Sequence, residues 1–524
     1  MRRSRQRSLA AAVAAAVLAV SAAAWAVQAV EPFVTASVQV TANPAPVRNH
    51  TSPQIARSPR TGELVIVESD VRGDRACKVH ISVDDGRTWR PGGELMVQPF
   101  TDCAIFAEYG AYATLAFASD GTLYVAFVAS EFLDRVRNDT PRHVYLARSG
   151  DSGRTFDAAR VFEAPDGNPD RGLNKGPMLA VHPSRPEVVY VGWRQGIFAP
   201  NAREKLKSNV SVSTDGGRTF SEPFDLTDPR GGDYPALAVG GDGTVHAVYW
   251  SRVWPAPPAG TPAPVRPIYY RQSTDRGRTW SPAREIDPGN QRADRPPVMA
   301  ADPASESVYV TWYAGNEPEN QREGYTGDIE VYFLASPDKG ATWRPRTVLN
   351  DDGREGKRAN QYDPAIGVAP DGRVDVAWLD GRLSPLAPVT GVTPAERGLQ
   401  DVYYSSSSDG GRTFTPNLRV TDRSIDRALG TWENNVGSHY NLGLASAPEA
   451  VYIAWQDTRN AVPDRQPEDV YMASVRFAPL PSPLADDGSD GVPGWLLAAA
   501  GAALGAGLTM AVVLGRGRRA AAGG

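Results

Sequence analysis

Short apolar runs separated by polar turns recur along most of this chain. One kind of run follows a proline, as in Pro177–Val181 and Pro235–Val239. A second kind is rich in β-branched and aromatic residues, as in Val188–Trp193 and Val308–Trp312. Runs of this length that are bounded by turn residues are typical of β-strands. The pattern therefore predicts pairs of neighbouring strands that repeat along the chain.

A third run leads into a polar motif that occurs six times, with the pattern Ser-x-Asp-x-Gly-x-Thr followed by Trp or Phe. Its first copy is Ser82–Trp89, and its aspartates recur every 60 to 71 residues, as Asp84, Asp151, Asp215, Asp275, Asp338 and Asp409. An aspartate can accept hydrogen bonds from the backbone of a tight turn, and glycine permits the positive φ that such a turn needs. We expect these six aspartates to be structural.

A fourth strand after each motif would make every repeat a four-stranded sheet, or blade. A seventh set, Tyr440–Leu444, Val451–Trp455 and Asp469–Met472, has no motif and no outer strand. The unassigned run Phe33–Val40 could supply that strand and leave no open edge. The pattern predicts an all-β, seven-bladed β-propeller over residues 30–478, with six blades as the alternative.

The six motifs resemble the Asp-box, or bacterial neuraminidase repeat, of the sialidase-like β-propeller superfamily, and the resemblance covers residues 33–478. It implies a protein directed at glycans. Sialidases resemble one another in three arginines that bind the sugar carboxylate, a tyrosine nucleophile assisted by a glutamate, and an aspartic acid–base. Their Arg-Ile-Pro motif is absent here, where the first strand reads Pro53-Gln54-Ile55. Exo-α-sialidase activity and non-catalytic binding of glycan, peptide or protein partners are the two alternatives.

Strands alternate in direction within a blade, so the six motifs lie on one side of the ring, which we call the box face. The loops between second and third strands, and the connections between blades, lie on the other side, the loop face. Three of these loops are long: Trp254–Pro267, Asn316–Gly327 and Leu383–Gln400. Long loops on a rigid scaffold are common sites of function, so we expect the ligand on the loop face.

Arginines open several loops of the loop face, and three follow the pattern Asp-x-Arg after Asp70, Asp380 and Asp457. Arginine presents a fork of donors suited to carboxylates, but it also forms local pairs with neighbouring acids. The candidate binding residues are Arg72, Arg194, Arg252, Arg358, Arg382 and Arg459. The resemblance implies Asp70 as the acid and Tyr362, Tyr440 and Glu433 as further catalytic candidates. Tyr234 and Tyr362 occupy equivalent places before a proline.

The two ends of the chain carry signals for export and anchoring. Residues 1–29 combine four arginines with the apolar run Leu9–Val27, which predicts a cleaved signal peptide, with an uncleaved anchor as the alternative. Residues 479–494 form a Pro- and Asp-rich spacer, and residues 495–514 carry no charge over the length of a transmembrane helix. Residues 515–524 are basic, which predicts a cytoplasmic tail and a propeller outside the cell.

Composition narrows the remaining classes. The net charge is −5 and no basic stripe occurs, which argues against nucleic acid as a partner. The six histidines lack zinc-site spacing, so no metal site or cofactor is expected, and structural calcium is the alternative. The only cysteines, Cys77 and Cys103, both fall on the loop face. In an exported chain this pair predicts a disulfide, as opposed to two separate buried thiols.

Overall fold

The computed structural model divides the chain into two compact units, residues 1–478 and 479–524, and the second lies outside the described residues. The structure describes residues 32–42, 49–70, 77–95, 113–130, 142–164, 173–199, 202–227, 231–251, 267–288, 296–315, 329–352, 361–384, 398–427, 429, 442–461 and 468–477.

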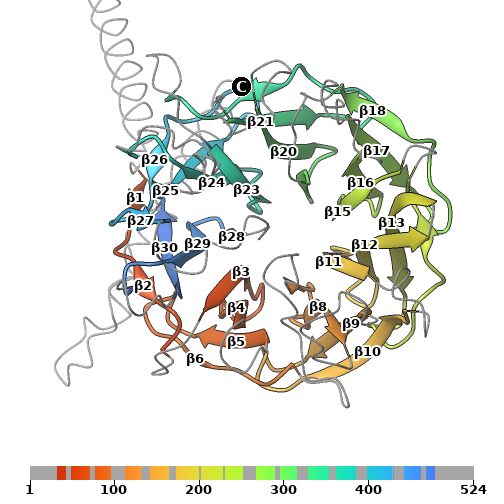
Figure 1. The fold of residues 1–524 in the computed structure, drawn as a ribbon, viewed down its shortest axis with the longest axis horizontal. Coiled ribbons are helices and arrows are strands. Elements are labelled where there is room, and N and C mark those ends of the chain that lie inside the picture. The colour runs from red at the N-terminus through yellow and green to blue at the C-terminus, as the bar shows by residue number, and fades with distance from the viewer. Residues whose placement is uncertain are drawn as a thin grey trace, which may run out of the picture. The chain divides into compact units, whose positions relative to one another are not determined.

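Seven antiparallel sheets are arranged in a ring, with the first strand of each sheet at the centre (Figure 1). The first blade is β3 (His50–Arg57), β4 (Leu64–Asp70), β5 (Cys77–Ser82) and β6 (Arg90–Pro91). The second is β7 (Thr114–Phe117), β8 (Leu123–Ser130), β9 (Arg142–Ser149) and β10 (Asp157–Phe162). The third is β11 (Leu173–Val181), β12 (Val189–Ala199), β13 (Ala202–Ser213) and β14 (Phe224–Asp225).

The next three blades repeat this order. The fourth is β15 (Asp233–Val239), β16 (Val245–Trp250), β17 (Ile268–Ser273) and β18 (Arg284–Asp287). The fifth is β19 (Val298–Ala301), β20 (Val308–Gly315), β21 (Ile329–Ser336) and β22 (Thr347–Val348). The sixth is β23 (Gln361–Val368), β24 (Val374–Asp380), β25 (Leu399–Ser407) and β26 (Leu418–Arg419), with β27 (Ile425–Asp426) also paired to β25.

The seventh blade joins the two ends of the described chain. It consists of β28 (Leu442–Ser446), β29 (Ala450–Asp457) and β30 (Asp469–Arg476), and its outer strands are β1 (Phe33–Val34) and β2 (Val38–Gln39). Both outer strands pair antiparallel with β30. The prediction of seven blades closed by an N-terminal strand is therefore confirmed.

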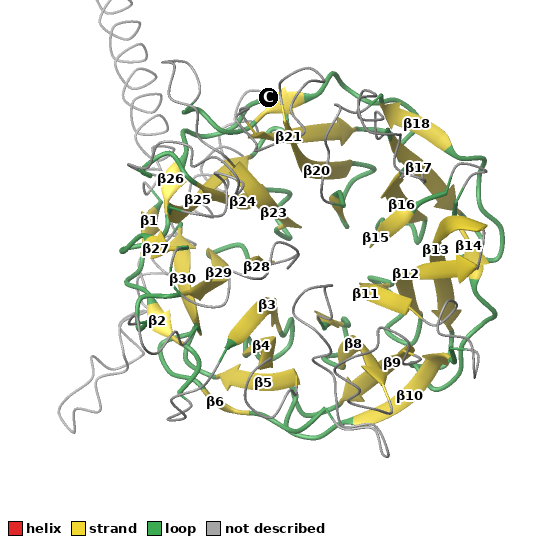
Figure 2. Cartoon of the chain, in the orientation of Figure 1, coloured by secondary structure: helices red, strands yellow, loops and turns green. Residues whose placement is uncertain are grey.

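The second strand of each blade is buried on both sides, because neighbouring blades pack face to face. Figure 2 shows the described part of the ring as strands and loops, and β29 is buried along its whole length. Four tryptophans of second strands, Trp193, Trp312, Trp378 and Trp455, are at most 1% exposed. Burying a large apolar side chain contributes about 1.5–3 kcal/mol, so each of these inter-blade contacts stabilises the ring.

The six box turns share one pattern of hydrogen bonds. In the first copy, Asp84 accepts from the Thr88 backbone N–H at 2.9 Å and from the Thr88 hydroxyl, while Gly86 N–H donates to Ser82 Oγ at 2.9 Å. The same bonds from the threonine N–H recur in the other five copies. Gly86 has a φ of 82°, a conformation that glycine adopts without strain.

The aromatic residue that ends each motif packs against the preceding blade. Phe414 of the sixth blade meets Phe333 of the fifth, with ring centroids 4.9 Å apart. Trp343 of the fifth blade meets Tyr270 of the fourth at 5.4 Å. The box turns therefore hold adjacent blades together, which accounts for the repetition of the motif without any role in chemistry.

Candidate functional site

Arg382 of the sixth blade is held by acids on the loop face. The Asp380 carboxylate accepts hydrogen bonds from the Trp378 indole at 3.0 Å and from the Arg382 backbone N–H at 2.9 Å. Its Oδ2 also lies 2.8 Å from Arg382 Nη2. Asp351, from the connection between the fifth and sixth blades, lies 2.6 Å from Nη1. The guanidinium covers the ring of Tyr403 at 4.1 Å from the ring centroid.

The seventh blade repeats this arrangement around Arg459. Asp457 accepts from the Trp455 indole at 2.9 Å and from the Arg459 backbone N–H at 2.8 Å, and its Oδ2 lies 2.7 Å from Arg459 Nη2. Asp422 lies 3.0 Å from Nη1. The guanidinium covers the ring of Tyr471 at 4.1 Å. In these two blades, the Asp-x-Arg pattern is part of a Trp-x-Asp-x-Arg unit that shapes its own loop.

Arg194, in the middle of β12, contacts residues of the fourth blade. Its Nε lies 2.8 Å from Asp233 Oδ1, and its guanidinium lies 5.3 Å from the centroid of the Tyr234 ring. The residue is only 8% exposed. Each of the three described candidate arginines thus lies against a carboxylate. Six other candidates lie outside the described residues: Arg72, Arg252, Arg358, Glu433, Tyr440 and Cys103.

The predicted equivalence of Tyr234 and Tyr362 is wrong by one residue. A register shift occurs in the first strand of both blades, between Asp233 and Ala236 and between Tyr362 and Ala365. The residue directly before the proline has a positive φ in each case, 40° at Tyr234 and 50° at Asp363. Tyr234 is therefore the counterpart of Asp363, because an irregularity of the strand places both at the same bend.

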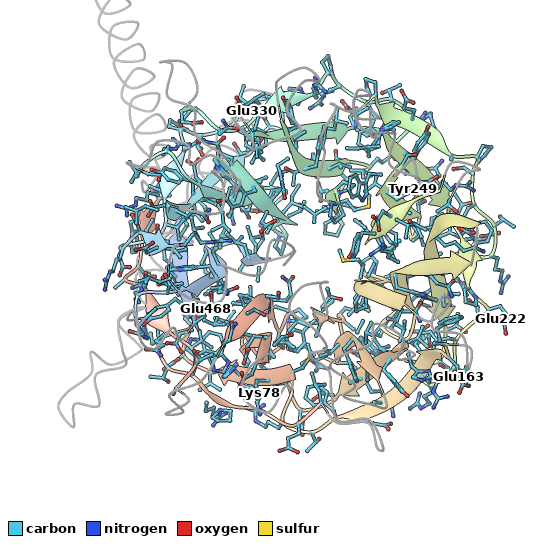
Figure 3. All side chains as sticks on the ribbon, viewed as in Figure 1. Lys78, Glu163, Glu222, Tyr249, Glu330 and Glu468 are labelled. Carbon is cyan, nitrogen blue, oxygen red and sulfur yellow. The ribbon has the colours of Figure 1, made fainter. Side chains whose placement is uncertain are left out.

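A group of acids and amides lies where the fifth and sixth blades meet on the loop face. Gln361, which begins β23, donates from Nε2 to Asp352 Oδ2 at 2.8 Å and lies 3.4 Å from Asp380 Oδ1. The Asn350 amide donates to Asp352 Oδ1 at 2.7 Å and also to Glu330 on β21 (Figure 3). These five residues, Glu330, Asn350, Asp352, Gln361 and Asp380, form what we call the acid–amide cluster.

The carboxyl of Asp352 differs from its neighbours in its affinity for protons. Its side chain is 5% exposed, and this burial is the main reason that its pKa is raised. The negative charge of Asp380 raises the pKa further, while the Asn350 hydrogen bond opposes the shift. For the adjacent Asp351, burial also raises the pKa, but the hydrogen bonds from Arg382 and the Asn417 N–H, together with the charge of Arg382, outweigh it and the pKa is lowered. The pKa values of these two adjacent carboxyls are therefore shifted in opposite directions.

Tyr362 lies at the edge of this cluster, directly after Gln361 in β23. Its ring centroid is 6.2 Å from that of Tyr313 on β20, and both residues are less than a tenth exposed. Of the predicted catalytic residues, Tyr362 is the one that the described structure brings next to the acid–amide cluster.

Asp70, the predicted acid, lies instead in the seam between the first and seventh blades, and it is completely buried. It pairs in register with His50, whose Nδ1 lies 2.9 Å from Glu68 Oε1. The same oxygen of Glu68 lies 3.2 Å from His80 Nε2. We call His50, Glu68, Asp70 and His80 the seam cluster. Asp70 therefore belongs to a buried cluster of the first blade, apart from the acid–amide cluster of the fifth and sixth blades.

The acid–amide cluster and the seam cluster are absent from the sequence-based predictions. Each depends on contacts between different strands, within the first blade for the seam cluster and across a blade boundary for Gln361 and Asp352, which no local motif encodes. The run Asn350-Asp351-Asp352, at the end of the fifth blade, is the one local signal that could have indicated the cluster.

Three further predictions concern the transmembrane helix, metal binding and the disulfide. Within the described ranges, no helix is long and apolar enough to cross a membrane, and residues 495–514 are not among them. In the same part of the chain, no three His, Cys, Asp or Glu side chains are grouped so as to hold a metal ion. Cys77, which begins β5, is 3% exposed, and its pairing with Cys103 stays a prediction.

No protein-family model matches the chain, and neither does any curated protein. Among solved structures, the α-L-arabinofuranosidase Arb93A of Fusarium graminearum is 13% identical, with 85% of this chain and 99% of that chain covered and a TM-score of 0.46. The phage phi92 endosialidase is 10% identical, with 88% and 71% covered and a TM-score of 0.46. The Trypanosoma rangeli sialidase is 11% identical, with 74% and 56% covered and a TM-score of 0.40. Sialidases are thus among the similar structures, as the motifs indicated, and the similarity concerns the fold.

Proposed function

We propose that this chain acts on or binds glycans, and that its ligand lies on the loop face where the fifth and sixth blades meet. The observation that carries this proposal is the acid–amide cluster, where the Gln361 amide of the sixth blade bridges Asp352 of the fifth blade and Asp380. The raised pKa of Asp352 adds to it. Most glycosidases need one carboxyl that keeps its proton and a second that is ionised. Asp352, whose pKa is raised, is the candidate for the first, and the adjacent Asp351, whose pKa is lowered, is the candidate for the second.

The same cluster suits recognition of a sugar without cleavage. Carboxylates accept hydrogen bonds from hydroxyl groups, and the amides of Asn350 and Gln361 offer both donors and acceptors. The rings of Tyr313 and Tyr362 add apolar surface beside these polar groups. A non-catalytic propeller that binds a glycan is therefore the second candidate, and measurement of turnover distinguishes the two.

The finer proposal, an exo-α-sialidase, requires arginines that are available to a sugar carboxylate. Arg194, Arg382 and Arg459 are already paired with acids at 2.7 to 2.8 Å. A sialic acid would have to displace those acids, at the cost of leaving them unpaired in a buried place. Sialidase activity would therefore depend on Arg72, Arg252 and Arg358.

The test uses the full chain, extracted in mild detergent, with a panel of fluorogenic glycosides and a glycan array. The panel includes a sialoside, an arabinofuranoside and a galactoside. Asp352→Asn removes the titrating carboxyl, and Glu222→Gln, at an exposed site on the outer side of the third blade, is the matched control. We expect Asp352→Asn to abolish turnover, or weaken binding, and Glu222→Gln to change neither. If no glycan in either test is cleaved or bound, the proposal is refuted.

We also propose that the loop face works outside the cell. The predicted signal segment and the apolar run 495–514 of the sequence support this proposal. Protease digestion of intact cells tests this point. We expect the propeller to be digested while a tag after residue 524 stays protected.

A further inference from the structure

A pocket opens on the box face between the fourth and fifth blades, on the opposite side from the acid–amide cluster. Turns of both blades line it: Gly240, Gly241, Asp242, His246, Pro303, Ala304, Ser305, Glu306, Ser307 and Lys339. The two turns touch at Gly241, where an added Cβ would lie 2.0 Å from the Pro303 carbonyl oxygen. Any larger residue at position 241 would force the turns apart, so the pocket depends on glycine there.

His246 presents a hydrogen-bond acceptor to this pocket. The residue is 1% exposed, and its Nδ1 lies 2.7 Å from the Tyr270 hydroxyl. That hydroxyl donates to the Lys339 carbonyl oxygen at 2.8 Å, so it accepts from Nδ1–H and the lone pair of the ring is on Nε2. Burial lowers the pKa of His246 to about 4, which keeps the ring neutral at physiological pH.

Glycine also accounts for the open position of Nε2. An added Cβ on Gly240 would lie 3.4 Å from His246 Nε2 and 3.2 Å from Asp242 Oδ1. The absence of that side chain therefore leaves space beside both acceptors. No hydrogen bond to Nε2 is found among the described residues. A ring nitrogen that accepts no bond from the described residues and lines a pocket is available to a ligand.

The charges around the pocket are already paired with one another. Lys339 Nζ lies 3.0 Å from Asp242 Oδ2 and 2.9 Å from Glu306 Oε1, so two of its three donors are used. An ion of either sign would have to compete with this internal pairing. A neutral ligand with several hydroxyl groups can bind without breaking it. Such hydroxyls can donate to His246 and Asp242 and accept from the remaining N–H of Lys339.

We propose that this pocket binds a neutral saccharide unit, as a second carbohydrate site on the box face. The site is independent of the function proposed for the loop face, because no residue is shared between the two. Its location would let the protein hold one part of a glycan, or a neighbouring chain, away from the acid–amide cluster.

The test is ligand-observed saturation-transfer NMR on the full chain in detergent. The neutral probes are methyl β-D-galactopyranoside and methyl α-L-arabinofuranoside, and the charged probes are N-acetylneuraminic acid and arginine amide. Gly240→Ala places a methyl group beside Nε2 and Asp242. Gly150→Ala, in another box-face turn with nothing within 4 Å of the added carbon, is the matched control.

We expect at least one neutral probe to bind the unmodified protein. In Gly240→Ala its affinity should be about fivefold weaker, or its NMR signal smaller, because about one hydrogen bond is lost. Gly150→Ala and the loop-face variant Asp352→Asn should bind as the unmodified protein does. Melting temperatures establish that each variant is folded. Binding of charged probes only, no binding of any neutral probe, or equal binding to Gly240→Ala would overturn the proposal.

Discussion

The seam cluster offers a test of how a buried charge stabilises the side of the first blade that packs against the seventh, through the substitution Glu68→Gln. The side chain of Glu68 is fully buried, and one of its oxygens lies 2.9 Å from His50 and 3.2 Å from His80. The glutamine keeps the shape but removes the charge that both rings face. Removing one partner from a buried ion pair typically costs about 3–5 kcal/mol. We expect a loss of stability in that range near pH 6.

The pH dependence of the loss follows from two opposite pKa shifts. Burial lowers the pKa of His50, but the charges of Glu68, Asp70 and Asp469 outweigh it and the pKa is raised above 6.5. Burial raises the pKa of Glu68, but His50 and His80 outweigh it and the pKa is lowered below 4.5.

The stabilisation by His50 is complete below pH 6.5 and is lost as the pH rises through the higher, folded pKa. The stabilisation by Glu68 is present above pH 4.5 and is lost as the pH falls through the lower, folded pKa. The seam is therefore most stable in the mildly acidic range between the two.

The assay is denaturant unfolding of the full chain at a series of pH values from 5 to 8.5. Glu449→Gln is the control, because Glu449 joins the same two blades through Arg57 at 2.7 Å but is 39% exposed. An exposed pair contributes about 1 kcal/mol or less, so this variant should lose little at any pH. The unmodified protein should lose stability toward alkaline pH, and Glu68→Gln should lose that dependence. The reasoning would be refuted if stability changed with pH in the same way in Glu68→Gln and in the unmodified protein. It would also be refuted if Glu449→Gln lost as much stability as Glu68→Gln.

Three other predictions concern activity, a box turn and the cysteines. If the chain cleaves glycans, activity should fall as the pH rises through the raised pKa of Asp352, and Asp352→Asn should remove this alkaline limb from the pH–rate profile. Gly340→Ala should cost more than about 1 kcal/mol in thermal or denaturant unfolding, because φ is +79° and the new carbon would lie 2.3 Å from Tyr270. If Cys77 and Cys103 form a disulfide, the gel mobility of the unmodified chain should change when reductant is added. The gel mobility of Cys103→Ser should not change.

The fold was predictable because its signals are local. The turn of Ser82–Trp89 carries its own hydrogen bonds, and its repetition sets the length of a blade. Strands such as Val374–Asp380 are buried on both sides, which gives the apolar runs that identify second strands. The N-terminal strand could be placed because the seventh set of runs lacked a partner.

The candidate site was less predictable because its contacts are not local. The Asp-x-Arg pattern left open whether Arg382 pairs with Asp380. The distance between Arg382 Nη2 and Asp380 Oδ2 in the structure shows that it does. The irregularity of β23 hides the true counterpart of Tyr234, since a bulge changes register without changing composition. Asp352 meets Gln361 only because one blade packs against the next.

The pairing of β1 and β2 with β30 also determines when the ring can be completed during synthesis. Thr35 and Ser474 are 439 residues apart in the chain, yet their backbones are joined by a hydrogen bond of 2.9 Å. A chain synthesised from its N-terminus must hold the segment around Phe33 unpaired until residue 476 has been added. Trimming at the N-terminus beyond Gln39 would leave β30 as an open edge, where a second chain could add its own strand. An intact segment from Phe33 to Gln39 is therefore a condition for a ring without an open edge.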